Sequence, residues 1–163
     1  MKKNGTHLIS PELWEAVMQE PREGMPTLAT IAYYSLDLLN LRAGDELVCD
    51  ASDTTIASGS SSAQLLLALH RKGVKVYNEP TLHAKVACIG DHVIIGSGNA
   101  SENSHRNLIE AAVFSRDSAL RAQAMALVRT LACPIKQGLL AERLGETIDP
   151  VARPPHLHSH YAN

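Results

Sequence analysis

Five residues between Leu82 and Glu110 carry side chains that can act together on a phosphate group: His83, Lys85, Ser97, Asn99 and Glu110. Alternate side chains of a strand point to one face, so a strand beginning near Leu82 would project His83 and Lys85 together. The histidine would serve as a nucleophile or an acid beside a fixed cation. Lys85 taken alone is equally compatible with a solvated lysine on an edge strand. Its pairing with His83 is what favours a site for an anion.

A β-hairpin is predicted to return the chain toward His83, with Gly90-Asp91 as its turn between two apolar runs. The segment Gly96-Ser97-Gly98-Asn99 follows the second run. We expect its two glycines to let the backbone approach a bound group closely and to turn N–H groups toward it. Ser97 and Asn99 would add side-chain donors, although each alone would be an ordinary turn residue. Such a turn suits an anionic oxygen.

Glu110 lies within an apolar run, Leu108 to Phe114, which we predict to be a strand. A buried carboxylate is costly unless it is paired. We therefore expect Glu110 to contact the ring of His83.

These residues resemble the signature of the phospholipase D superfamily, which reads H-x-K, then Asp, then G-S-x-N. Here it is His83-Ala84-Lys85 followed by Gly96-Ser97-Gly98-Asn99, and Glu110 stands eleven residues beyond the asparagine, as the family pattern has it. The family's aspartate usually stands five residues after the lysine, a place that Gly90 occupies. Asp91 comes one residue later, and no catalytic role is carried over to it.

The resemblance implies catalytic roles for His83, Lys85, Asn99 and Glu110, and phosphate binding by Lys85, Ser97 and Asn99. It implies metal-independent chemistry without a cofactor, in which one histidine attacks phosphorus to form a phosphohistidine and a second protonates the leaving oxygen. The chain has one complete motif, whereas this mechanism uses two histidines. We therefore expect a symmetric homodimer with a shared active site, its interface near Ser97 to Ser101.

The other predicted elements place this motif in an α/β fold, a mixed β-sheet flanked by helices with one motif per chain. We predict strands at 6–9, 28–34, 46–49, 74–77 and 108–114, and helices at 11–19, 63–72, 119–131 and 137–144. Residues 53–62 are predicted to be a polar loop, and Ser62 and Gly73 to bound the helix between them. Residues 46–77 read as a parallel, right-handed β-loop-α-β unit. Residues 1–148 are expected to form one phospholipase D-like domain, and 149–163 a flexible C-terminal tail.

Composition limits the classes of partner and compartment. A length of 163 residues with 45% apolar residues suits one domain, and two full catalytic lobes would not fit. The net charge of −2 is not the strongly basic balance of proteins held to nucleic acid by bulk electrostatics, although a local basic rim would suffice. Cys49, Cys88 and Cys133 have no metal-ligand spacing and are expected to be buried free thiols. Without an apolar signal segment or a membrane span, a cytoplasmic protein is expected.

Several other residues have ordinary explanations. His70-Arg71-Lys72 repeats the H-x-K spacing, but we assign it to a helix C-terminus, where cations are favoured. Trp14 is expected to anchor the core rather than to stack on a base. His92 and His105 flank the motif and would either line the cleft or lie on the surface. The tail histidines His156, His158 and His160 are expected to be part of a disordered tail rather than a metal site.

Substrate is the least constrained inference. Compact single-motif members of the superfamily tend to be nucleases, and no amphipathic segment indicates a lipid surface, so cleavage of DNA or RNA is expected first. Hydrolysis of a phospholipid or another small phosphodiester is the alternative within the enzyme class. A module that binds nucleic acid without turnover is the alternative outside it.

Overall fold

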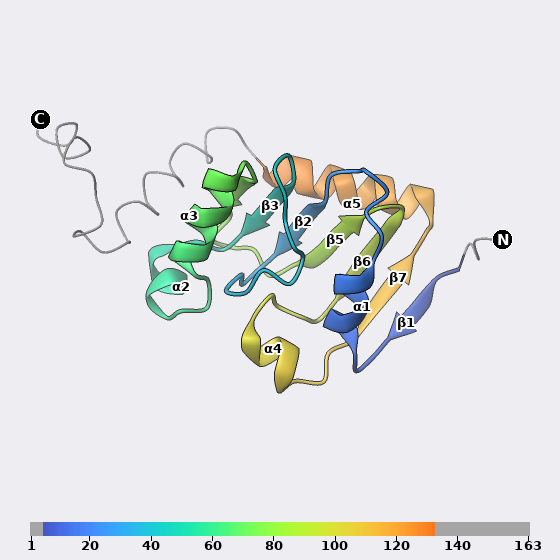
Figure 1. Cartoon of the computed structure of the whole chain (residues 1–163), viewed down its shortest axis with the longest axis horizontal. Coiled ribbons are helices and arrows are strands. Elements are labelled where there is room, and N and C mark those ends of the chain that lie inside the picture. Colours follow the sequence, from blue (N-terminus) through green and yellow to red (C-terminus); the bar gives the residue numbers. More distant parts are fainter. Residues whose placement is uncertain (1–4, 133–163) are drawn as a thin grey trace, which may run out of the picture.

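The computed structural model describes residues 5–132 as a mixed sheet of seven strands with helices on both faces (Figure 1). The strand order is β1-β7-β6-β5-β2-β3-β4, and the fold is the predicted α/β arrangement. The elements in chain order are β1 His7–Ile9, α1 Leu13–Gln19, β2 Leu28–Ile31, β3 Glu46–Cys49, α2 Asp53–Ala57, α3 Ala63–Lys72, β4 Lys75–Asn78, β5 Lys85–Ile89, β6 His92–Gly96, α4 Glu102–Arg106, β7 Ala112–Ser115 and α5 Ser118–Leu131.

Strands β2, β3 and β4 form the parallel half of the sheet. The predicted parallel unit is confirmed here, with α3 as its crossover helix. The Ser62 hydroxyl accepts a hydrogen bond from the amide of Leu65 at 3.2 Å, which caps the first turn of α3. Gly73 ends the helix in a left-handed conformation, with φ of 101°, as glycine does at many helix C-termini.

Strands β5, β6, β7 and β1 form the antiparallel half. The predicted hairpin is confirmed, because Ile89 pairs with His92 across Gly90-Asp91. Gly90 has φ of 55°, and a β-carbon there would collide with the carbonyl oxygen of Pro21. Strand β5 pairs with β2 on its other side, so the hairpin joins the parallel half directly.

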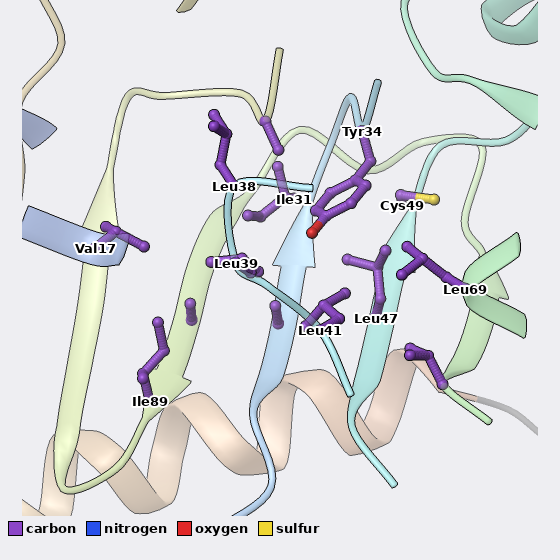
Figure 2. Close-up of a cluster of buried hydrophobic side chains, with 14 of the residues drawn as sticks. Val17, Ile31, Tyr34, Leu38, Leu39, Leu41, Leu47, Cys49, Leu69 and Ile89 are labelled. Atoms are coloured by element: carbon purple, nitrogen blue, oxygen red, sulfur yellow. The ribbon is translucent and has the colours of Figure 1, made fainter. Parts of the chain in front are cut away.

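Two apolar cores lie on opposite faces of the sheet. The face covered by α1 and α3 contains Trp14, Tyr34, Phe114 and many aliphatic side chains, part of which Figure 2 shows. The opposite face is covered by α5, which packs across β6, β5, β2 and β3. Trp14 is buried, as predicted for a core anchor. Cys49 and Cys88 are buried free thiols, also as predicted, and burial raises the pKa of both; Cys133 lies outside the described residues.

Several predicted elements differ from the structure. The predicted polar loop 53–62 contains the short helix α2, and the unpredicted helix α4 follows Ser101. The strand predicted at 28–34 ends at Ile31, and the strand predicted at 108–114 begins only at Ala112. Helix α1 starts at Leu13 rather than Pro11, because the Ser10 hydroxyl donates to the carbonyl of Glu110 instead of capping the helix. The predicted helix at 137–144 and the tail at 149–163 lie outside the described residues. No helix in the described part of the chain is long and apolar enough to cross a membrane.

Candidate phosphodiesterase site

His83 lies at the edge of the sheet where β2 ends and β5 begins. It precedes β5 by two residues rather than lying within it, and its side chain is exposed. The backbone there is fixed by a hydrogen bond of 3.1 Å from the amide of Ala32 to the carbonyl of Ala84. The Lys85 ammonium lies 3.4 Å from His83 Nε2 and donates to the His83 carbonyl at 3.0 Å. The structure therefore brings His83 and Lys85 together through direct contact rather than through strand alternation.

Tyr33 links His83 to the turn after β6. Its ring makes an edge contact with the His83 imidazole, with the ring centroids 6.5 Å apart. Its amide donates to Asn99 Oδ1 at 3.2 Å, and its carbonyl accepts from the amide of Ala100 at 3.1 Å. Asn99 is thereby held on the same edge as His83. Its side-chain NH2 group has no hydrogen-bond partner within residues 5–132, so it can donate to a ligand.

The two glycines of this turn are required by packing within the chain. A β-carbon at Gly96 would lie 2.6 Å from the carbonyl oxygen of Ala111 and 2.5 Å from the β-carbon of Ala112. One at Gly98 would lie 2.8 Å from Leu13 and 3.1 Å from the indole of Trp14. The close approach that these glycines permit within the protein is to β7 and α1, and their approach to a bound group stays a prediction. The glycines let the turn sit tightly on the protein.

Glu110 is buried, and two serine hydroxyls donate to its carboxylate. Ser97 Oγ donates to Oε2, and Ser104 Oγ donates to Oε1 at 2.7 Å. Ser104 in turn accepts from the indole N–H of Trp14 at 3.1 Å. The predicted contact of Glu110 with the His83 ring is not found among the described residues, because the two serines satisfy the carboxylate instead. Glu110 holds the turn that carries Ser97 and Asn99.

The hydrogen bonds of Ser97 also affect its expected role toward phosphate. Its hydroxyl donates to Glu110 and accepts from the amide of Ala111 at 3.1 Å. Ser97 can therefore donate to a phosphate oxygen only by exchanging its bond with Glu110.

The charge of Lys85 depends on both burial and Glu110. Burial lowers the pKa of Lys85 from its usual value, and the Glu110 carboxylate opposes this shift. The Lys85 ammonium is thus partly desolvated. A partly desolvated cation attracts an anionic oxygen more strongly than a cation in bulk solvent does.

Two contributors to the site were missed in the sequence. Tyr33 falls at the end of the strand predicted at 28–34, and nothing in its local pattern marks it as a neighbour of His83. Ser104 was in principle detectable through helix α4, since Ser101 caps that helix by accepting from the amide of Ser104 at 3.1 Å. A serine followed by polar residues and a helical turn is a common start signal.

The remaining histidines near the motif lie away from His83. His92 is buried at the turn of the hairpin, at the other end of β5 and β6, where its Nδ1 pairs with Glu20. His105 on α4 is 3.3 Å from the carboxylate of Glu15. Within residues 5–132, Glu20, Asp91 and His92 form the one group with the residue types of a metal site. Arg116, which follows β7, donates to Asp91 at 3.1 Å. This ion pair links the turn of the hairpin to the end of β7, which is a structural role for Asp91.

Comparison with known proteins assigns this chain to a family. The family model described as "Cardiolipin synthase, PLD-like domain" matches residues 46–131, which is more than half of the chain and includes the whole motif. The chain belongs to the phospholipase D superfamily. No curated protein matches the sequence.

Several solved structures share the fold. Nuc from Salmonella typhimurium, a phospholipase D family member, aligns with a TM-score of 0.57 at 12% identity, over 78% of this chain and 93% of Nuc. NucT from Helicobacter pylori aligns with a TM-score of 0.57 at 15% identity, over 78% of this chain and 94% of NucT. The archaeal chromatin protein TrmBL2 aligns with a TM-score of 0.50 at 7% identity, over 80% of this chain and 53% of TrmBL2. The phospholipase D-like sheet predicted from the motif is thereby confirmed.

Proposed function

We propose that this protein is a metal-independent phosphodiesterase, and that it is a nuclease that cleaves DNA or RNA in a homodimeric active site. The observation that carries the proposal is the exposed imidazole of His83, whose Nε2 lies 3.4 Å from the Lys85 ammonium on the edge that also holds Asn99. An accessible nucleophile beside a fixed cation is the minimum that attack on a phosphodiester anion requires.

The reaction would proceed in two displacements. In the first, His83 Nε2 of one subunit forms a bond to phosphorus while the bond from phosphorus to the leaving oxygen breaks, and protonated His83 of the other subunit gives that oxygen its proton. In the second, the latter imidazole takes a proton from water as the water oxygen bonds to phosphorus and the bond from phosphorus to His83 breaks. Each displacement therefore has its own nucleophile and its own proton transfer.

The surrounding residues would stabilise charge on the non-bridging oxygens. Lys85 and the Asn99 amide would donate to these oxygens, and Ser97 would exchange its bond with Glu110 for one to phosphate. Fixed donors of this kind matter most in the pentacovalent transition state, where negative charge is greatest. Glu110 would act by keeping the Ser97 turn in position and by supporting the charge of Lys85.

A nuclease is favoured over other phosphodiesterases because the neighbours Nuc and NucT share this fold over nearly their whole length. Cleavage of a phospholipid is the second candidate, since the matching family model is described by cardiolipin synthase. A third candidate binds DNA without turnover, since the neighbour TrmBL2 is described by its mode of DNA binding. Buried Cys49 and Cys88 support a reducing, cytoplasmic setting.

The test is incubation of the full chain with labelled single-stranded DNA, double-stranded DNA, RNA and a short-chain phospholipid, each with and without EDTA. We expect cleavage of a nucleic acid at an equal rate in EDTA, because Lys85 and neutral donors stand where a metalloenzyme would gather ligands. Cleavage of the phospholipid alone would support the second candidate, and binding of DNA without cleavage the third. Loss of activity in EDTA with recovery in Mg²⁺ or Zn²⁺ would contradict the mechanism.

A further inference from the structure

Tyr33 differs from the other tyrosine, tryptophan and phenylalanine residues that the structure describes. Those others are buried in the two apolar cores: Trp14, Tyr34, Tyr77 and Phe114. Tyr33 belongs to neither core and is only partly buried. An aromatic ring gains most from burial in a core, so a ring placed elsewhere calls for another explanation. The ring of Tyr33 lies against the imidazole of His83.

The backbone that carries Tyr33 is hydrogen-bonded to both halves of the site. On one side, the amide of Ala32 donates to the carbonyl of Ala84, and these two residues are the chain neighbours of Tyr33 and His83. On the other side, Tyr33 accepts from the amide of Ala100 at 3.1 Å and donates to Asn99 Oδ1 at 3.2 Å. The ring of Tyr33 is therefore held beside His83 by a fixed backbone.

The contacts of His83 show what its ring lacks. Its Nε2 lies 3.4 Å from the Lys85 ammonium, and its Nδ1 has no hydrogen-bond partner within residues 5–132. The Glu110 carboxylate is bound by two serines instead. A contact at one ring atom leaves the imidazole free to pivot about that atom. In the proposed reaction Lys85 donates to a phosphate oxygen, so even this contact weakens when substrate binds.

We propose that Tyr33 is a positioning residue whose ring holds the His83 imidazole in the orientation for attack on phosphorus. The proposal rests on the proposed function, which supplies the reaction. The two ring centroids are 6.5 Å apart and the ring planes are at 80°, which is a favourable edge-to-face arrangement. The phenol hydroxyl has no hydrogen-bond partner among the described residues, so the ring itself provides the support. A reacting group misplaced by about 1 Å can lose about 10²-fold in rate.

The first test compares kcat and KM for cleavage by the full chain and two variants. Tyr33→Phe keeps the ring, and Tyr33→Leu removes it. We expect kcat to fall by about 10- to 100-fold in Tyr33→Leu, with KM unchanged because the ring acts on His83 and not on the substrate. Tyr33→Phe should retain the wild-type kcat. Both variants should melt close to wild type, because Tyr33 lies outside the two cores.

Thr81→Ala is the matched control. Thr81 lies in the same loop between β4 and β5, two residues before His83, and its hydroxyl donates to Glu79 at 2.9 Å. This variant changes the loop without removing a contact of the imidazole, so kcat should stay at the wild-type value.

The second test does not depend on cleavage. In nuclear magnetic resonance spectra of protein labelled with ¹³C-histidine, the His83 ring signals are those that disappear in His83→Ala. The nearby aromatic ring should displace these signals in wild type and in Tyr33→Phe. In Tyr33→Leu they should move toward the positions of a free histidine.

The outcomes separate the role of Tyr33 from the proposed function. Unchanged His83 signals in Tyr33→Leu would overturn the proposal whether or not a substrate is cleaved. Unchanged kcat would also overturn it, as would a loss in Tyr33→Phe equal to that in Tyr33→Leu, or a raised KM at constant kcat, which would make Tyr33 a substrate contact. Signals that move as expected in a wild-type protein that cleaves no phosphodiester would uphold the support of the His83 ring and contradict the proposed function.

Discussion

His83 is the residue on which the proposed chemistry depends most directly. Its ring is exposed, and within residues 5–132 it contacts the Lys85 ammonium and the edge of the Tyr33 ring. In the proposed mechanism, replacing His83 with Ala removes both the nucleophile of one subunit and the acid of the other. We expect cleavage to fall by more than about 10⁴-fold, since a general acid alone contributes about 10² to 10⁴.

The control for this change is His70→Ala, which removes the histidine of the second H-x-K spacing at the end of α3. It should leave cleavage unchanged. Both variants should melt close to wild type, because His83 lies outside both apolar cores. A folded His83→Ala protein with undiminished cleavage would place the active site elsewhere.

Glu110 should set the alkaline limit of activity through Lys85. Burial lowers the pKa of Lys85 and the Glu110 carboxylate raises it, so the lysine is charged below its lowered pKa and loses its proton as the pH rises through that value. Glu110→Gln removes the opposing charge, and the pKa of Lys85 should fall further. We therefore expect the alkaline limb of the pH–rate profile to move to lower pH in this variant.

Glu102→Gln is the matched control for that measurement. Glu102 is an exposed carboxylate on α4 that pairs with Arg106, and it should leave the profile unchanged. An alkaline limb that stays in place in Glu110→Gln would show that Lys85 titration does not limit the reaction.

At this scale the sequence predicts which residues act but not all of their partners. The pairing of His83 with Lys85 is a contact between neighbours in the chain, which their spacing reveals. The Glu110 carboxylate accepts from Ser97 in the turn after β6 and from Ser104 on α4, and Ser104 in turn accepts from Trp14 on α1, 90 residues away from it. The motif spacing does not reveal that two serines satisfy the Glu110 carboxylate, and the contact of Glu110 with His83 expected from that spacing was wrong within one chain.

The turn after β6 is positioned by close packing of elements, and this makes Gly96 a structural requirement. An added methyl group at Gly96 would meet the carbonyl oxygen of Ala111 at 2.6 Å, and backbone atoms cannot move aside as side chains do. We expect Gly96→Ala to lower the free energy of unfolding by about 1–3 kcal/mol, measured in urea, because strands β6 and β7 must separate.

Gly24→Ala provides the comparison. Gly24 has φ of 74° and no atom within 4 Å of an added β-carbon, so its replacement measures the conformational cost alone, on the order of 1 kcal/mol. Gly96→Ala should cost more than Gly24→Ala. Equal costs would mean that the contact with Ala111 relaxes freely.

The elements that the sequence predicts well have strong local signals. Helix α3 has the predicted bounds because Ser62 caps it and Gly73 ends it, and the β5–β6 turn falls on Gly90-Asp91. Strand β7 begins at Ala112, later than predicted. Residues 108–111 include apolar residues typical of a strand, but they belong to the loop between α4 and β7 that carries Glu110. The order of strands was not predictable, since pairing of β5 with β2 depends on contacts distant in the chain.

For the whole molecule, the proposed shared site requires two histidines while each chain has one motif. Whether one active site uses the histidines of both subunits can be measured by mixing intact and inactive subunits.

Equal amounts of wild-type and His83→Ala protein, unfolded together and refolded, would form random dimers in which half are mixed. If both histidines serve one site, the mixed dimers are inactive and activity per total protein falls to about one quarter of the wild-type value. If each chain has its own complete site, the activity stays at about one half. Refolded wild type alone sets the reference, and mixing with His70→Ala should leave the activity unchanged. A value near one half, measured with subunit exchange confirmed by a mass tag, would contradict the shared site.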